Sequence, residues 1–332
     1  MTTTASTLPA TMRAIAFDAY GGPERLTLHV LPVPDLGPDE VLVEVEAAGV
    51  GVWDAKQREG ATAAMEPDGG LPFPVVPGAD GAGTVRVVGA AVRDFAIGDH
   101  VYGYSFLSPK GGFHAEYAAV PADAVARIPA GLDVVEAAAL AVPAITALRG
   151  LDALHVKRGD RVLVFAASGG VGHVAVQLAK ALGADVMAVV SSEDGADLAR
   201  SLGADPVVDV RLDDLPLALR SFAPHGLDAV FAAANGDGLA QAIADLKPGG
   251  RVGWPNGVEP VPEAGPDVVA SAFDGRPDRD LLDRLNALIE SLRDHHPRFT
   301  VHVARTFAFA DAADAHRAMT SHHLGRMVLQ PK

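Results

Sequence analysis

The chain contains no cysteine among its 332 residues. This absence excludes disulfide bonds and any metal site built on thiolate ligands. It suits a reducing compartment, and we therefore expect a cytoplasmic protein. Twelve histidines remain, but none forms a convincing H-x3-5-H pattern together with a carboxylate, so we expect no metal ion.

Long hydrophobic runs and an excess of positive charge are also missing. The longest apolar stretch, residues 137–148, is interrupted by Pro143 and falls short of the about 20 residues that a membrane span requires. The first twelve residues lack the apolar segment of a signal peptide, so none is expected. The formal net charge of -15 disfavours nucleic acid and anionic membranes as partners, because both need clustered Lys and Arg.

The chain has two regions of different composition, and its 332 residues are too many for one ordinary hydrophobic core, so we expect two domains. Residues 13–127 read as short strands between dense Gly and Pro, which favours an irregular, barrel-like β domain. Residues 133–154 are rich in Ala and Leu and are expected to be mostly helical. Farther on, apolar strands alternate with helices, which predicts a doubly wound parallel sheet with right-handed crossovers. The predicted strands are 161–166, 185–191, 207–210, 228–232, 251–254 and 268–273, followed by helices 280–292 and 310–320 and a strand 326–329.

The most informative segment is the A-x-G-x-x-G turn of residues 167–172, between a buried strand and an amphipathic helix. Strand, tight turn and helix form the context of a dinucleotide phosphate site, because glycines let the backbone approach the pyrophosphate. The free N–H groups of the first helical turn then point at the anion. A βα turn that binds nothing is the alternative. The predicted phosphate-binding residues are Ser168, Gly169, Gly170, Val171 and Gly172.

Further motifs, read together with this turn, resemble a known family. Residues 49–60 (GVGVWDAKQREG) are similar to the segment G-V-N-x-x-D-x-K-x-R-x-G, and residues 77–85 (PGADGAGTV) to P-G-x-D-x-x-G-x-V of the medium-chain dehydrogenase/reductase superfamily. The resemblance extends to GDHV, AEY and the final GRMVL, over residues 12–329. It implies an α/β protein with a GroES-like β-rich catalytic domain (1–127 and 296–332) and a Rossmann cofactor domain (128–295).

Departures from the family pattern concern the metal ligands. Zinc alcohol dehydrogenases of this superfamily place Cys near the position of Gly51 and His-Glu at the positions of Ala79 and Asp80. The chain therefore resembles the zinc-free branch of quinone oxidoreductases and enoyl reductases. This resemblance implies a homodimer that transfers hydride from NADPH to a quinone or an α,β-unsaturated carbonyl compound. Without a Lewis acid, an alcohol is hard to deprotonate for oxidation, whereas the reduction of such an electrophile needs less activation.

Ser191, at the end of the second Rossmann strand, bears on the choice of cofactor. NAD enzymes place an acidic residue there to bind the ribose 2′-OH, so an uncharged serine favours NADP over NAD. Ser192 and Arg211 are further candidates for a 2′-phosphate, although Ser191 and Ser192 could equally cap the next helix. NAD stays open, because the lysine of similar enzymes is Gly195 here. The other predicted cofactor residues, after the fourth and fifth strands, are Ala234, Asn235, Trp254 and Asn256.

Candidates for the chemistry lie in residues 51–56 and at Thr146. Lys56 could donate a hydrogen bond to a developing oxyanion, or it could be a solvated surface lysine. Asp54 is expected to order its loop rather than to transfer a proton. Thr146 matches a family position near the nicotinamide, with helix packing as the alternative. The predicted substrate residues are Gly51, Trp53, Tyr104, Phe106 and Phe113, with core packing as the alternative for the aromatic side chains.

Two other functions stay open. Many similar reductases hold Asn where this chain has Gly51. That difference allows a specialised biosynthetic reductase or cyclase acting on an iminium or an enone. A nucleotide-binding sensor without turnover is the alternative from a different class.

Overall fold

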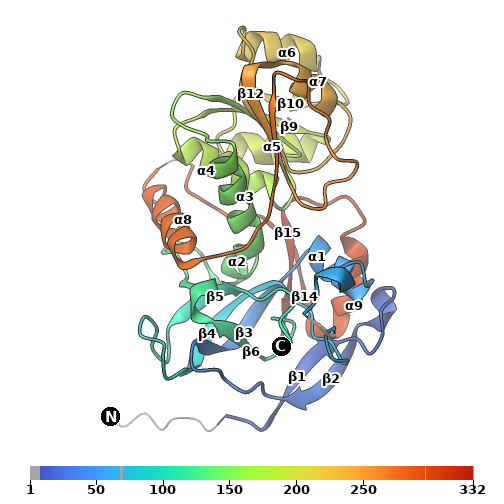
Figure 1. The fold of residues 1–332 in the computed structure, drawn as a ribbon, viewed down its shortest axis with the longest axis vertical. Coiled ribbons are helices and arrows are strands. Elements are labelled where there is room, and N and C mark those ends of the chain that lie inside the picture. Colours follow the sequence, from blue (N-terminus) through green and yellow to red (C-terminus); the bar gives the residue numbers. More distant parts are fainter. Residues whose placement is uncertain (1–7, 68–69, 296, 332) are drawn as a thin grey trace.

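The computed structural model describes residues 8–67, 70–295 and 297–331, which form two lobes (Figure 1). Residues 1, 296 and 332, which limit the two predicted segments of the catalytic domain, lie outside the described residues. The domain boundaries therefore stay a prediction. No helix in the described part of the chain is long and apolar enough to cross a membrane.

One lobe is built on a six-stranded parallel sheet in the order β10-β9-β8-β11-β12-β13. Its strands are β8 (Arg161–Phe165), β9 (Asp185–Val190), β10 (Val207–Asp209), β11 (Leu227–Ala232), β12 (Leu246–Pro255) and β13 (Val269–Phe273). This is the strand order of a doubly wound dinucleotide-binding fold, so the predicted fold class is confirmed. The sequence prediction differed at β12, which begins five residues earlier than expected because residues 246–250 continue the strand through an irregular register beside β11.

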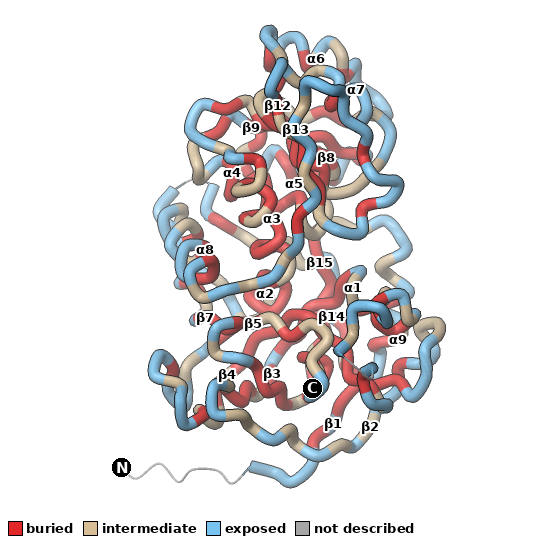
Figure 2. The backbone as a smooth tube through the Cα atoms, viewed as in Figure 1, coloured by how far each residue is buried: buried red, intermediate tan, exposed pale blue. Residues whose placement is uncertain are grey.

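Helices cover both faces of this sheet, as the alternation of side chains along β8 requires. Val162 and Val164 face a cluster that includes residues of α3, α4, α5 and α8, whereas Leu163 and Phe165 face α6 and α7. The buried strands form the red centre of this lobe in Figure 2. The helices are α3 (Ala141–Ala153), α4 (Gly172–Ala181), α5 (Glu193–Ser201), α6 (Leu215–Phe222), α7 (Leu239–Ala244) and α8 (Arg279–Ser291).

The sequence of helix α8 explains where this helix begins and which of its faces is buried. The Asp278 side chain accepts a hydrogen bond from the Leu281 N–H at 2.8 Å and so caps the first turn. Leu281, Leu285 and Ile289, spaced at four residues, form its buried stripe. The predicted helix 280–292 is therefore confirmed within one residue at each end.

The other lobe holds a seven-stranded sheet with the path β14-β15-β3-β4-β5-β7, on which β6 also pairs with β3. Although β14 and β15 are the last strands of the chain, β15 pairs antiparallel with β3. The C-terminal segment thus runs from one lobe into the other. The strands are β3 (Glu40–Val50), β4 (Asp80–Val88), β5 (His100–Tyr104), β6 (Tyr117–Pro121), β7 (Val125–Arg127), β14 (Val303–Ala308) and β15 (Arg326–Gln330).

Smaller elements complete this lobe. A two-stranded sheet pairs β1 with β2 in antiparallel register. The remaining elements are β1 (Thr11–Ala16), β2 (Thr27–Pro32), α1 (Val52–Arg58), α2 (Val134–Ala138), α9 (Ala312–Ala318) and short 3-10 turns at Pro23–Arg25, Ala63–Met65, Ala122–Ala124 and Phe309–Asp311. Helix α1 lies at the side of this lobe that faces the six-stranded sheet, which brings residues 51–58 to the space between the lobes (Figure 1).

Candidate functional site

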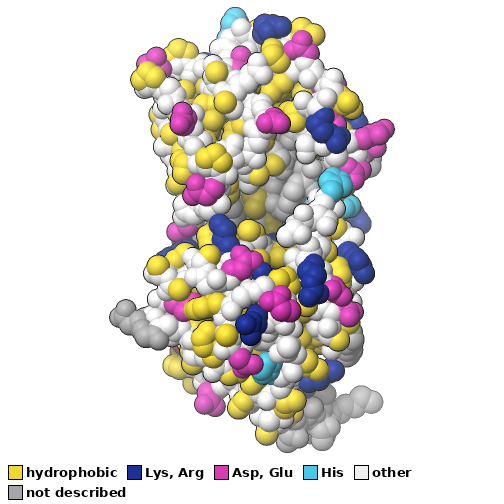
Figure 3. All heavy atoms as spheres, turned by 90° about the vertical axis from the view of Figure 1, so that its right-hand side faces the viewer, with side chains coloured by type: hydrophobic (Ala, Val, Ile, Leu, Met, Phe, Trp, Pro, Cys, Tyr) yellow, Lys and Arg dark blue, Asp and Glu magenta, His cyan; other side chains and the backbone are white. Residues whose placement is uncertain are grey.

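Two adjoining cavities lie between the lobes, where one face of the molecule is hollowed (Figure 3). The first, which we call the crevice, has a volume of about 700 Å³ and is lined by the glycine turn and by residues that follow β11 and β12. The second, which we call the aromatic cavity, has a volume of about 560 Å³. Both are lined by Trp53, Ala79, Val142, Thr146, Pro255 and Asn256, which form their junction.

The glycine turn brings the start of α4 close to the end of β8. The Gly169 N–H donates to the Ala166 carbonyl oxygen at 3.1 Å. A Cβ on Gly172 would overlap that same oxygen, so only glycine allows α4 to begin this close to β8. Gly169, Gly170 and Val171 line the crevice at the N-terminal end of α4, where N–H groups and the helix dipole favour an anion.

His173 ties this turn to the C-terminal segment. Its Nδ1 lies 2.8 Å from the Gly169 carbonyl oxygen and so carries the proton, while its Nε2 accepts from the His302 N–H at 3.2 Å. Burial lowers the pKa of His173 to about 4, so the ring is neutral near pH 7. Sequence reasoning had treated His173 only as part of the helix.

Arg326, at the start of β15, is the main site residue that sequence reasoning missed. It lines the crevice beside the glycine turn, where a Cβ on Gly170 would lie 3.0 Å from its Cδ. Its Nη2 donates to Asp80 Oδ1 at 2.7 Å, and both side chains are buried. A Cβ on Gly51 would lie 3.2 Å from its Cζ and overlap Nη1. Gly51 therefore leaves the room that this guanidinium occupies.

The buried carboxylates of Asp80 and Asp54, close to Ala79 and Val142 of the junction, have different environments. Burial raises the pKa of Asp80 to about 6, although Arg326 and the Val142 N–H at 3.1 Å act in the opposite direction. Asp54 is also buried, and it accepts from the N–H groups of Gly51 at 2.7 Å and Ala79 at 2.8 Å. These bonds are those of a residue that orders the loop around α1.

Lys56 and Trp53 reach across the space between the lobes. Lys56 Nζ donates to the Gly257 carbonyl oxygen at 3.3 Å and lies 4.9 Å from the centre of the Trp53 ring. Trp53 packs edge-on against Phe106, with ring centres 5.5 Å apart. The ammonium group of Lys56 thus has a protein acceptor in this structure.

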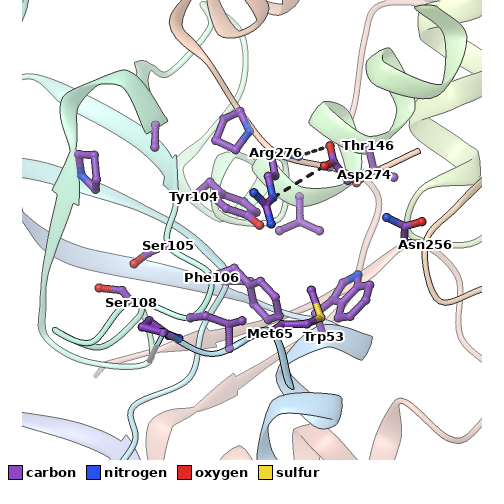
Figure 4. A pocket seen from close by; sticks show the side chains of 18 of the residues that line it. Trp53, Met65, Tyr104, Ser105, Phe106, Ser108, Thr146, Asn256, Asp274 and Arg276 are labelled. Carbon is purple, nitrogen blue, oxygen red and sulfur yellow. Dashed lines mark hydrogen bonds and ion pairs between the residues drawn. The ribbon is translucent and has the colours of Figure 1, made fainter. Parts of the chain in front are cut away.

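The aromatic cavity has mainly apolar walls, which include Trp53, Phe106 and Met65 (Figure 4). Its ionic side chains are paired: Lys110 with Glu40 at 2.6 Å and Arg276 with Asp274 at 3.7 Å. Burial raises the pKa of Tyr104 to about 12, so this phenol keeps its proton at neutral pH. Thr146 comes from α3 and is largely buried.

Phe113 does not reach either cavity. Its side chain is fully buried in the core of the seven-stranded sheet. A Cβ on Gly81 would lie 2.7 Å from the Phe113 Cβ, and one on Gly103 would lie 3.3 Å from its Cζ, so these glycines make room for the ring. Phe113 thus packs in the core, the alternative for this side chain, and the prediction that it forms a pocket wall is wrong.

Several predicted cofactor residues line neither cavity. Ser192 caps α5 by accepting from the Gly195 N–H at 3.1 Å, and Ser191 is exposed beside it. Arg211 pairs with Asp209 at 2.9 Å. Ser168 Oγ would lie 2.8 Å from a Cβ on Gly195, and Trp254 packs in the sheet core. Ala234, Asn235 and Asn256, in contrast, line the crevice.

Metal-ligating side chains are not gathered in the described ranges: no three His, Asp or Glu residues there come close enough to hold a metal ion.

Comparisons with known proteins agree with this layout. A family model described as an alcohol dehydrogenase GroES-like domain matches residues 37–130, and one described as a zinc-binding dehydrogenase matches residues 170–257. The chain is 35% identical to an NADPH-dependent alkenal/one oxidoreductase, chloroplastic, from Arabidopsis thaliana over 98% of this chain and 81% of that protein. It is 36% identical to a quinone oxidoreductase from Lama guanicoe over 73% of this chain and 72% of that protein. The solved structure of the quinone oxidoreductase from Coxiella burnetii superimposes with a TM-score of 0.82 at 29% identity, covering 97% of this chain and 100% of that one.

Proposed function

The chain belongs to the quinone oxidoreductase-like branch of the medium-chain dehydrogenase/reductase superfamily, and from this premise we propose that it reduces quinones or α,β-unsaturated carbonyl compounds with NADPH. The observation that carries the proposal is the junction of the two cavities. A phosphate cradle opens on one side of it and an apolar cavity on the other. A nucleotide and an electrophile bound in these two spaces would meet there.

The residues present fit a dinucleotide. Gly170 and Val171 offer backbone N–H groups to a pyrophosphate, and Arg326, whose guanidinium is paired with Asp80, lies beside them. Ser191, Ser192 and Arg211 are the candidates for a 2′-phosphate, while Asn235 and Asn256 line the side of the crevice after β11 and β12. When bound, NADPH supplies the hydride. NADP is proposed over NAD because Ser191 is uncharged and because the Arabidopsis relative is described as NADPH-dependent.

The aromatic cavity suits a planar, largely apolar electrophile. Trp53 and Phe106 provide flat surfaces, and the cationic side chains in the wall already have carboxylate partners. Lys56 remains a candidate to donate a hydrogen bond to a developing oxyanion, although its bond to the Gly257 carbonyl oxygen would first have to break. Thr146 is proposed to contact the reacting groups because it lines both cavities.

The reaction is proposed to need no metal ion. Gly51 and Ala79 bring no donor side chain to the junction, and the Asp80 carboxylate is already bound to Arg326. Zinc would require about three suitable ligands there. Inductively coupled plasma spectrometry of active protein tests this point, and one equivalent of zinc that is needed for turnover would contradict it.

A homodimer is proposed through β13, which ends the path of the six-stranded sheet. Val269 is 56% exposed at the start of this strand, and an unpaired edge with an apolar side chain is a template for pairing with a second copy. Light scattering of the wild type and of Val269→Lys tests it: we expect a dimer that the lysine weakens, and a wild-type monomer would contradict it. A cytoplasmic location stays a prediction.

Titration with NADPH and with NADH, followed by turnover assays on enones and quinones, tests the function. We expect tighter binding of NADPH and oxidation of NADPH by at least one electrophile of either class. Binding without turnover would favour the nucleotide sensor, and turnover of an iminium alone would favour the biosynthetic reductase.

A further inference from the structure

Tyr104 is held next to the junction of the two cavities. It is the last residue of β5, where it pairs with Asp80 across the sheet. The N–H of the next residue, Ser105, donates to the Ala79 carbonyl oxygen at 2.8 Å, and Ala79 lines both cavities. Main-chain hydrogen bonds therefore fix the position of the Tyr104 backbone near the place where hydride transfer would occur.

The Tyr104 hydroxyl is free to bind a ligand. Two residues earlier, Tyr102 is fully buried and its hydroxyl donates to Asn286 Oδ1 at 2.8 Å. In contrast, the Tyr104 hydroxyl neither donates nor accepts a hydrogen bond among the residues that the structure describes. Figure 4 shows the hydroxyl directed into the aromatic cavity, near Arg276 and Phe106. Tyr104 is half-buried in the wall of this mainly apolar cavity, so a ligand in the cavity can accept a hydrogen bond from its hydroxyl.

Partial burial keeps this phenol protonated. Burial is the main cause of its raised pKa; Asp274, Asp80 and Asp54 act in the same direction, and Arg276 opposes them. The hydroxyl is thus a donor throughout the physiological pH range. It is also available without breaking another contact, unlike Lys56, whose Nζ is bound to the Gly257 carbonyl oxygen.

We propose that Tyr104 is a catalytic residue that donates a hydrogen bond to the substrate oxygen on which negative charge develops. The inference rests on the proposed reductase function. In an enone, a C–H bond forms at the β-carbon with the hydride electrons, the C=C pair moves between the α-carbon and the carbonyl carbon, and the C=O pair moves to oxygen. The Tyr104 O–H stabilises that anion and stays intact. Water then protonates the α-carbon, and the carbonyl group forms again.

Tyr104→Phe tests the proposal, with Tyr102→Phe as the matched control. Loss of one donor to a developing oxyanion lowers kcat by about 100-fold, so we expect that loss for Tyr104→Phe with an enone such as 3-penten-2-one. The dissociation constant of NADPH is expected to stay within about twofold, because Tyr104 lines the aromatic cavity and not the crevice. Tyr102→Phe is expected to lose stability but to keep its kcat.

A second test measures the binding of an anion to Tyr104 directly, without turnover. The probe is 4-nitrophenolate, a planar anion with its charge on oxygen, followed by its absorbance. We expect its dissociation constant to rise by about tenfold or more in Tyr104→Phe, as for a lost hydrogen bond to a charged group, and to stay unchanged in Tyr102→Phe.

The outcomes separate this inference from the function on which it rests. An active wild type together with a Tyr104→Phe variant whose kcat is within threefold would overturn the role of Tyr104 and leave the reductase function standing. Equal losses in Tyr104→Phe and Tyr102→Phe, or equal binding of 4-nitrophenolate by wild type and Tyr104→Phe, would overturn it as well. A wild type that reduces no enone or quinone with either nucleotide would overturn both proposals.

Discussion

Replacing Gly51 with alanine removes the space that the Arg326 guanidinium occupies. The backbone of Gly51 has φ -145, which alanine adopts without strain. The new Cβ would lie 3.2 Å from Cζ and 3.3 Å from Nη2 of Arg326, and it would overlap Nη1. The Arg326 guanidinium must therefore shift, and because it is buried against Asp80 we expect its 2.7 Å hydrogen bond to that carboxylate to be lost.

The size of the effect follows from the burial of Asp80, whose side chain is 0% exposed. Breaking a buried ion pair on one side costs about 3–5 kcal/mol because a charge is left without its partner. At pH 7.5 we expect a loss of about that size in the free energy of unfolding. The pKa of Asp80 is already raised to about 6, so at pH 5.5 the carboxyl takes up a proton and the loss shrinks.

Urea unfolding at the two pH values measures this loss. Gly265→Ala is the matched control, since nothing lies within 4 Å of its Cβ position and its φ is not positive; a change within about 0.5 kcal/mol is expected there. In an Arg326→Met background, Gly51→Ala should no longer act through the ion pair, and its cost should fall to that of the control. A Gly51→Ala variant as stable as Gly265→Ala at pH 7.5 would refute the reasoning.

Three further predictions concern the glycine turn and the nucleotide. The pKa of His173 is lowered to about 4 in the folded state, so the neutral ring stabilises the fold fully above about pH 6.5, and about 3 kcal/mol of that stability is lost as the pH falls toward 4. The free energies of unfolding of wild type and His173→Asn, measured in urea, should therefore converge in acid, and a constant difference between them would contradict this prediction. Gly172→Ala places a Cβ against the Ala166 carbonyl oxygen, a backbone atom that cannot move aside, so calorimetric titration should show NADPH binding weakened by about tenfold or more relative to Gly265→Ala; unchanged affinity would show that the turn is not the phosphate cradle. Arg211→Ala should weaken NADPH binding more than NADH binding, since only NADPH carries the 2′-phosphate; equal effects would remove Arg211 from the site.

Local pattern was enough to predict most of the fold. The strands of the six-stranded sheet have continuous apolar runs, so their period and turn residues place them within a few residues of β8, β9, β10, β11 and β13. The glycine turn was recognised for the same reason, because strand, turn and helix are consecutive in the chain. The start of β12 was missed because Pro248 and Gly249 are typical of turns, yet they lie in an irregular part of the ladder.

The contacts that complete the site join residues far apart in the chain. Arg326 and Asp80 are 246 residues apart, and His173 and His302 are 129 apart. No spacing or periodicity connects such positions, so neither pair was predicted, although the GRMVL motif that contains Arg326 was noticed. Phe113 shows the reverse case: an aromatic residue near a predicted pocket was placed in its wall, but Gly81 and Gly103 leave room for it in the core.

The central claim is that the turn at residues 167–172 cradles a nicotinamide nucleotide beside a cavity that works without a metal ion. A crystal structure of the protein with NADPH, recorded with anomalous scattering at the zinc edge, tests it most directly. We predict the pyrophosphate within hydrogen-bond distance of the Gly170 and Val171 N–H groups, the nicotinamide ring at the junction near Thr146, and no anomalous peak there. An empty crevice, or a transition metal bound at the junction, would contradict the account.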